Sequence, residues 1–124
     1  MLLAVNYLHG SEIIHRDIKL ENFLIKINKK DKQIESNSII LADLGFAFCS
    51  GGLYSPKSKM GTPAYIAPEM LTNKTYTNKI DCWSLGICLI ELITGTSPFK
   101  KFTGDGVKKV ICYKPIEFEN IHGW

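Results

Sequence analysis

The stretch HRDIKLEN, from His15 to Asn22, places acidic, basic and carboxamide side chains close together in this chain. Apolar residues flank the stretch, Ile13-Ile14 before it and Phe23-Leu24-Ile25 after it. A short loop between two buried segments can hold such groups rigidly while they stay exposed at a cleft. We therefore expect residues 15–22, called loop 15–22 below, to be the centre of a functional site.

Three side chains of loop 15–22 suit chemistry on a phosphate. Asp17 can accept a proton from a hydroxyl group. Lys19 can neutralise phosphate charge, and Asn22 offers an oxygen to a hard cation. The alternative is a loop whose charges only face water and whose histidine is a satisfied core residue.

Loop 15–22 matches the pattern H-R-D-x-K-x-x-N, and in this the chain resembles the eukaryotic serine/threonine protein kinases, whose catalytic loop carries that pattern. With five fixed residue types, a chance match is on the order of one in three million per start position. The continuation Glu21-Asn22-Phe23-Leu24 is similar to the calcium/calmodulin-dependent and related groups.

Three later segments match the same family in the expected order. Residues 61–69 read GTPAYIAPE and closely resemble the G-T-P-x-Y-x-A-P-E end of a kinase activation segment. Asp43-Leu44-Gly45 resembles the D-F-G motif with leucine in the phenylalanine position, and leucine can still fill an apolar slot. Residues 81–86 resemble the D-x-W-S-x-G segment of the kinase hub helix, whose aspartate bonds the catalytic-loop backbone. These matches argue against an unrelated phosphotransferase that shares only an acid-x4-Asn loop.

The resemblance implies transfer of the γ-phosphoryl group of ATP to a serine or threonine hydroxyl of a protein, with ATP and Mg²⁺ as cofactors. Asp17 would orient the acceptor hydroxyl and take its proton, while Lys19 would steady the phosphoryl group in catalysis and nucleotide binding. Asn22 and Asp43 would hold magnesium, and Asp43 would also contribute to nucleotide binding. Thr62 would bond near Asp17 and shape the acceptor site, and with Lys19 it fits serine/threonine rather than tyrosine kinases.

Further residues allow two interpretations each. Leu24 resembles the residue that packs on the adenine face, and plain core packing is the compatible alternative. Ser58 sits where the activating phosphate often goes, and a phosphate there could pair with Arg16 in a regulatory contact. The alternative is an unmodified loop serine. Glu21 could pair with a basic substrate residue or simply be solvated.

We expect an α+β fold that is mainly helical, a fragment of the kinase large lobe with a short β-hairpin. Residues 1–9 have helical spacing, and Gly10-Ser11 should stop that helix. Short strands are expected over residues 23–27 and 39–42, joined by a polar loop. A short amphipathic helix is expected over residues 105–112.

The strongest helix pattern covers residues 78–94. Asn78 can cap this helix, with Asp81 three residues further on, and Gly95 should end it. Apolar residues occur nearly all round it, so we expect a central buried helix. A buried aspartate must be satisfied, so Asp81 is expected to have a structural role.

Composition indicates one globular domain, with 124 residues of which 45% are hydrophobic and 22% charged. The net charge of +3 comes almost entirely from lysine, which argues against a nucleic-acid partner.

The four cysteines lack C-x-x-C spacing, so free thiols in a reducing compartment are expected, with Cys82 and Cys88 buried. The apolar run over residues 83–93 is too short to span a membrane. We expect an intracellular, cytoplasmic protein; the sequence does not indicate its oligomeric state.

By resemblance, residues 1–124 form part of a kinase domain, with a catalytic loop at 15–22, an activation segment at 43–69 and the hub helix at about 78–94. The sequence contains no G-x-G-x-x-G loop, no V-A-I-K lysine and no partner-glutamate helix, so the small lobe and the last helices are expected to be absent. Glu69 would then lack the arginine with which it pairs in the family. The expected function is a serine/threonine kinase fragment that is inactive as an isolated chain. The alternative is a non-catalytic remnant that binds proteins.

Overall fold

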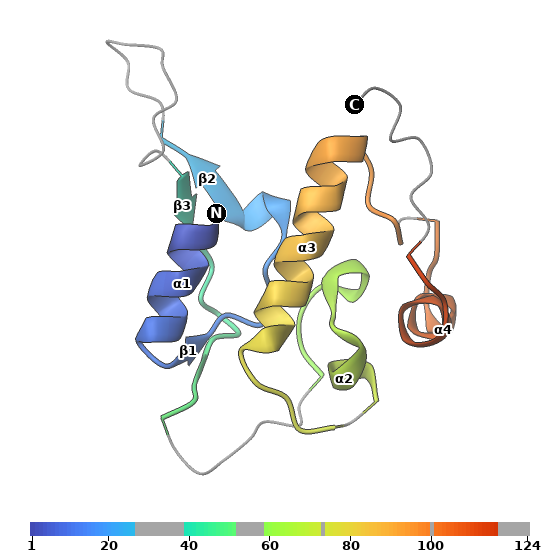
Figure 1. The fold of residues 1–124 in the computed structure, drawn as a ribbon, viewed down its shortest axis with the longest axis horizontal. Coiled ribbons are helices and arrows are strands. Elements are labelled where there is room, and N and C mark those ends of the chain that lie inside the picture. Colours follow the sequence, from blue (N-terminus) through green and yellow to red (C-terminus); the bar gives the residue numbers. More distant parts are fainter. Residues whose placement is uncertain (27–38, 52–58, 73, 100, 117–124) are drawn as a thin grey trace.

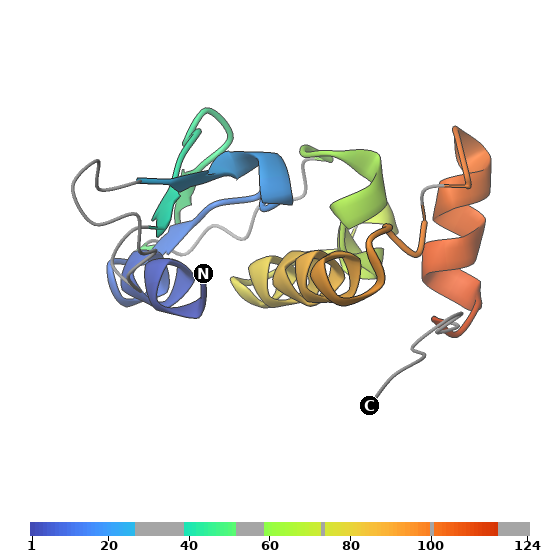
Figure 2. The same ribbon diagram turned by 90° about the horizontal axis from the view of Figure 1, so that it is seen from above.

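The computed structural model describes residues 1–26, 39–51, 59–72, 74–99 and 101–116. Figure 1 shows helix α3 in the middle of the molecule, with α1 and the strands on one side and α2 and α4 on the other. Figure 2, turned by 90°, shows α1 and α3 in one layer and the strands β2 and β3 in a layer over α1. The elements in chain order are α1 (Leu2–Gly10), β1 (Ile13–Ile14), the 3-10 turn η1 (Leu20–Asn22), β2 (Phe23–Ile25), β3 (Ile39–Leu41), β4 (Phe48–Cys49), the 3-10 turn η3 (Pro63–Tyr65), α2 (Pro68–Leu71), α3 (Lys79–Thr94) and α4 (Asp105–Tyr113).

Two short antiparallel strand pairs flank loop 15–22. The expected pair is present: β2 aligns with β3 so that Phe23 faces Leu41 and Ile25 faces Ile39. The polar loop expected between them lies outside the described residues. A second pair, β1 with β4, was not predicted, because strands of two residues show no alternation. Loop 15–22 therefore begins at the end of one strand and ends at the start of another.

The helices expected at the two ends of the chain are confirmed. Helix α1 includes Gly10, and Ser11 follows as its cap residue. Helix α4 covers the predicted amphipathic segment, and its Val107 and Ile111 are buried. In the described part of the chain, no helix is long and apolar enough to cross a membrane.

Helix α3 ends as predicted but begins differently. Gly95 adopts the left-handed conformation with φ of 75°, and its N–H donates to the carbonyl of Glu91 at 2.8 Å. The predicted Asn78 side-chain cap is wrong, because Asn78 already has helical backbone angles and its side chain makes no capping bond. The hydroxyl of Thr77 instead accepts the N–H of Lys79 at 3.3 Å.

Helix α3 is central, but the prediction that it is buried all round is wrong. One face packs inward through Ile80, Asp81, Ser84, Ile87 and Cys88. The opposite face is open, because no described residue covers it, and it exposes Leu89, Leu92 and Ile93. The same asymmetry explains a second correction: Cys88 is buried as predicted, whereas Cys82 is exposed.

The buried face of α3 divides the core into two clusters. Ile87 and Cys88 join residues from α1, loop 15–22 and α4 in the larger cluster. Ile80 joins Ile14 and Met70 in the smaller one, and Trp83 packs against both. Because both clusters are built on one helix, α3 fixes the position of loop 15–22 relative to the segment at 61–69.

Candidate functional site

A buried carboxylate on α3 holds the backbone at the start of loop 15–22. Asp81 is 1% exposed, and its Oδ2 accepts the N–H of His15 at 2.8 Å while its Oδ1 accepts the N–H of Arg16 at 3.0 Å. The imidazole Nε2 of His9, at the end of α1, lies 2.8 Å from the same Oδ2. The expected structural role of Asp81 is therefore confirmed, and its partners come from two other elements.

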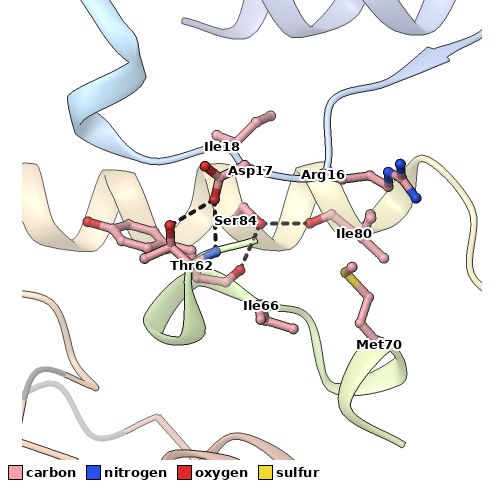
Figure 3. Close-up of a pocket in the computed structure, with 9 residues that line it drawn as sticks. Arg16, Asp17, Ile18, Thr62, Ile66, Met70, Ile80 and Ser84 are labelled. Atoms are coloured by element: carbon pink, nitrogen blue, oxygen red, sulfur yellow. Dashed lines mark hydrogen bonds between the residues drawn. The ribbon is translucent and has the colours of Figure 1, made fainter. Parts of the chain in front are cut away.

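Asp17, Lys19 and Thr62 form a hydrogen-bonded cluster, although Thr62 is far away in the sequence. Asp17 Oδ1 accepts both the N–H and the hydroxyl of Thr62, each at 2.8 Å (Figure 3). Lys19 Nζ donates to Asp17 Oδ2 at 2.9 Å and to Thr62 Oγ1 at 3.1 Å. The structure thus brings together three of the predicted catalytic residues, and both carboxylate oxygens of Asp17 are engaged.

These contacts set the charge states in the cluster. Burial by itself raises the pKa of Asp17, but the hydrogen bonds from Lys19 and Thr62 and the charge of Lys19 outweigh it and lower the pKa. The hydrogen bond to Asp17 raises the pKa of Lys19, and the charges of Glu21 and Asp43 add to this. At neutral pH the site therefore holds an ionised carboxylate beside a protonated amine.

Loop 15–22 and residue 61 lie very close together, and this closeness requires glycine at position 61. Gly61 has φ of 102°, a conformation that favours glycine. A Cβ at this position would lie 2.5 Å from the carbonyl oxygen of Arg16. Glycine at the start of the 61–69 segment therefore lets Thr62 reach Asp17.

Asn22 and Asp43 are linked through Ala42. Asn22 is buried, and its Nδ2 donates to the carbonyl of Asp17 at 2.8 Å, which leaves Oδ1 as the oxygen available to a cation. The N–H of Ala42 donates to the carbonyl of Asn22 at 2.8 Å. His15 Nε2 lies 3.1 Å from the carbonyl oxygen of Ala42. These bonds bring the end of β3, and with it Asp43, to loop 15–22.

The donor set at Asn22 and Asp43 fits magnesium. One carboxylate and one amide oxygen are hard ligands, and Mg²⁺ usually binds proteins through one or two such groups and completes its shell with phosphate oxygens and water. Asp43 is exposed, and its Oδ1 accepts the N–H of Gly45 at 3.2 Å. Among the described residues no group of three His, Cys, Asp or Glu side chains could hold a metal, so the phosphates would have to supply further ligands.

Leu24, Arg16 and Ser58 are the remaining predicted site residues, and Ser58 lies outside the described residues. Leu24 on β2 is 53% exposed, so the alternative of plain core packing is wrong. Arg16 donates through Nε to the carbonyl of Phe46, and its guanidinium lies 5.4 Å from the ring centroid of Phe48. Arg16 is therefore held against the chain that follows Asp43.

The structure also places His15 and Glu69, for which the sequence gave expectations. His15 is fully buried and hydrogen-bonded, since its Nδ1 accepts the N–H of Asp17 at 3.3 Å, so it is a satisfied core histidine that also ties the site together. Glu69 is half-buried, and the ion pairs found among the described residues do not include it.

Sequence reasoning missed two contacts that fix the segment at 61–69 on α3. The hydroxyl of Tyr65 donates to the carboxylate of Glu91, and burial together with this bond raises the pKa of Tyr65. Ser84 Oγ lies 2.7 Å from the carbonyl of Tyr65 and lines the hollow beside Asp17 (Figure 3). Ser84 belongs to the D-x-W-S-x-G segment, so the sequence marked this position but did not indicate its partner.

Comparison with known proteins agrees with this geometry. A family model for the protein kinase domain matches residues 1–122. The hormonally up-regulated neu tumor-associated kinase of Homo sapiens is 42% identical over 102 residues, which cover 80% of this chain and 13% of that protein. The DNA damage response protein kinase DUN1 of Saccharomyces cerevisiae is 37% identical over 115 residues, 84% of this chain and 22% of the relative. The serine/threonine-protein kinase dkf-2 of Caenorhabditis briggsae is 40% identical over 101 residues, 82% of this chain and 8% of the relative.

Proposed function

This chain belongs to the protein kinase family, and on that premise we propose that it carries the central part of a serine/threonine kinase catalytic site. The single observation that carries the proposal is the cluster in which Asp17 accepts hydrogen bonds from Thr62 and Lys19. The chain spans less than a quarter of the length of each relative described above, so activity is proposed for the protein that contains a whole domain.

In the proposed reaction, a serine or threonine hydroxyl of a protein attacks the γ-phosphorus of ATP. The bond between this phosphorus and the β,γ-bridging oxygen breaks, ADP leaves, and the hydroxyl proton passes to Asp17. The lowered pKa of Asp17 keeps it ionised, so it can orient the hydroxyl as a hydrogen-bond acceptor. The ammonium of Lys19 lies beside this carboxylate, where it can stabilise charge on the transferring group.

The proposed cofactors are ATP and Mg²⁺. Magnesium, when bound, neutralises phosphate charge and holds the phosphates in place. Asn22 and Asp43 would be its protein ligands, supported by the bonds that tie Ala42 to loop 15–22. Leu24 is proposed as part of the adenine surface, which its exposure on β2 supports.

Regulation by phosphorylation of Ser58 is a separate proposal. Arg16 would pair with that phosphate, and its place against Phe46 and Phe48 puts a cation beside the start of the segment that leads to Ser58. In a completed domain, Ser58→Ala should lower phosphate transfer, and unchanged activity would remove this proposal.

The proposed function is tested by completing the domain with the preceding and following segments of one relative. Transfer of labelled phosphate from Mg·ATP to a basic serine peptide is measured, and Asp17→Asn should reduce kcat by about 10²–10⁴-fold. The 124-residue chain alone should show no transfer, since its sequence has no phosphate-covering glycine loop. A completed domain that folds and binds Mg·ATP without transferring phosphate would favour the alternative, a protein-binding remnant.

A further inference from the structure

We propose that the exposed side of α4 is a docking surface for an acidic segment of a partner protein. The surface, called the α4 surface below, consists of Lys108, Lys109, Tyr113 and Lys114. The inference goes beyond the proposed catalytic function, because none of these residues belongs to the catalytic cluster or to the proposed metal site.

The net charge of the chain is concentrated around α4. Residues 101–116 contain four lysines and one aspartate, which gives this segment a net charge of +3. The whole chain has 15 cationic and 12 acidic residues and the same net charge of +3, so the rest of the chain contains equal numbers of the two signs. Charge of one sign that is gathered in one segment creates a potential that attracts partners of the opposite sign. The α4 surface is therefore the part of the chain that should attract an anionic partner.

The lysines of the α4 surface are not neutralised by neighbouring carboxylates. All three are exposed, and the ion pairs found among the described residues include none of them. Asp105 lies one helical turn before Lys108 and Lys109, at spacings that allow ion pairs on a helix, but in the described part of the chain no such pair forms. These amines are therefore available to carboxylates of another molecule.

Tyr113 adds an aromatic ring to the α4 surface. Its side chain is 78% exposed, and it lies one turn after Lys109, which places the two residues on the same side of the helix. Figure 2 shows α4 at one end of the molecule, away from α1 and the strands. Aromatic side chains are enriched where proteins bind one another. A protein segment that combines carboxylates with an apolar or aromatic side chain would match both features of the surface.

Two other anionic partners match α4 less well. An amphipathic helix binds a membrane through its apolar face, but the apolar face of α4 is used in folding, since Val107 and Ile111 are each 4% exposed and belong to the larger core cluster. Nucleic-acid surfaces depend strongly on arginine, and the cations of the α4 surface are all lysines. The observations therefore favour an acidic protein segment over a membrane or a nucleic acid.

The test is direct binding to the 124-residue chain, which requires no phosphate transfer and is independent of whether the kinase proposal holds. The probe is a fluorescently labelled oligoglutamate peptide that carries one phenylalanine, and its binding is followed by fluorescence anisotropy. The same peptide with glutamine in place of glutamate should bind about tenfold more weakly or worse, because it lacks the charge complementarity. Salt at about 1 M, which shortens the Debye length to about 3 Å, should remove most of the binding.

Charge reversal then locates the binding surface. The double variant Lys108→Glu with Lys109→Glu should weaken binding of the oligoglutamate peptide by about tenfold or more, because like charges then face each other. Lys26→Glu with Lys79→Glu is the matched control, since it changes the net charge equally at exposed positions after β2 and at the start of α3. It should change the affinity by less than about threefold, because exposed charges beyond a Debye length are screened.

Several outcomes would overturn the proposal. No binding of the oligoglutamate peptide, or unchanged affinity in the α4 double variant, would show that the surface does not bind acidic segments. Equal weakening in the two double variants would show a general attraction to a cationic chain. Tighter binding of a single-stranded RNA or of phosphatidylserine vesicles than of the peptide, lost in the α4 double variant, would assign the surface to another class of partner.

Discussion

Replacement of Asp81 by asparagine should destabilise the chain far more than its small change in shape suggests. The carboxylate accepts three bonds, whereas an asparagine has one oxygen and one NH₂ group. If the oxygen keeps the bond from Arg16, the NH₂ group points at the N–H of His15, which cannot become an acceptor. His9 can adapt by presenting an unprotonated Nε2. At least one charge-assisted bond is lost and one buried N–H is left unpaired, so we expect a loss of about 3–5 kcal/mol.

That loss is a large part of the roughly 5–15 kcal/mol that stabilises a typical domain. It is measured by urea unfolding followed by circular dichroism, where the midpoint should fall by about 2 M for a slope of about 2 kcal/mol per M. Asp43→Asn is the matched control, because it makes the same chemical change at an exposed residue with φ of 64°, which asparagine also tolerates. It should change stability by less than about 0.5 kcal/mol. Equal midpoints for the two variants would refute the account of Asp81.

Three further predictions concern backbone, thiols and pH. Gly61→Ala should destabilise the chain by about 1–3 kcal/mol because of its positive φ and close neighbour, whereas Gly86→Ala inside α3 should stabilise it by about 0.5–1 kcal/mol; opposite signs in urea unfolding would check this pair. Burial raises the pKa of Cys88 to about 12, so in the folded chain iodoacetamide should label Cys82 and spare Cys88, as mapped by mass spectrometry. The lowered pKa of Asp17 means that its charge stabilises the fold above the unfolded value of about 3.9 and that this contribution is lost as the pH falls through the folded value. Asp17→Asn should flatten that part of the acid unfolding curve, and an unchanged curve would contradict the assignment.

The sequence predicted the elements whose signals are local. Helix α3 is predominantly apolar and is followed by a glycine, and Gly95 does adopt the left-handed conformation that ends it. The pattern could not reveal which apolar face of α3 is covered, because coverage depends on other segments. The start of α3 was missed for a similar reason, since Thr77 and Asn78 are both good cap residues and only the backbone angles distinguish them.

The motif spacing predicted which residues would meet, and the cluster of Asp17, Lys19 and Thr62 forms as expected. The supporting contacts were less accessible. The role of Asp81 followed from the resemblance, but its bond to His9 depends on the packing of α1 against α3 and has no sequence pattern. The β1–β4 pair was likewise not predictable, because strands this short are recognised by the strand with which they pair and not by their own composition.

Ala42 gives the proposed metal site a thermodynamic advantage. The N–H of Ala42 donates to the carbonyl of Asn22, and its carbonyl oxygen is bonded to the ring of His15. The backbone on both sides of Ala42 is therefore ordered before any ligand binds. A ligand that orders its own binding groups loses part of its affinity to their conformational entropy, about 0.5–1.5 kcal/mol for each side chain fixed. The backbone at Ala42 is already ordered in the folded chain, so ligand binding does not have to order it. Nucleotide affinity at this site should consequently depend on the rest of the domain more than on rearrangement at Asn22 and Asp43.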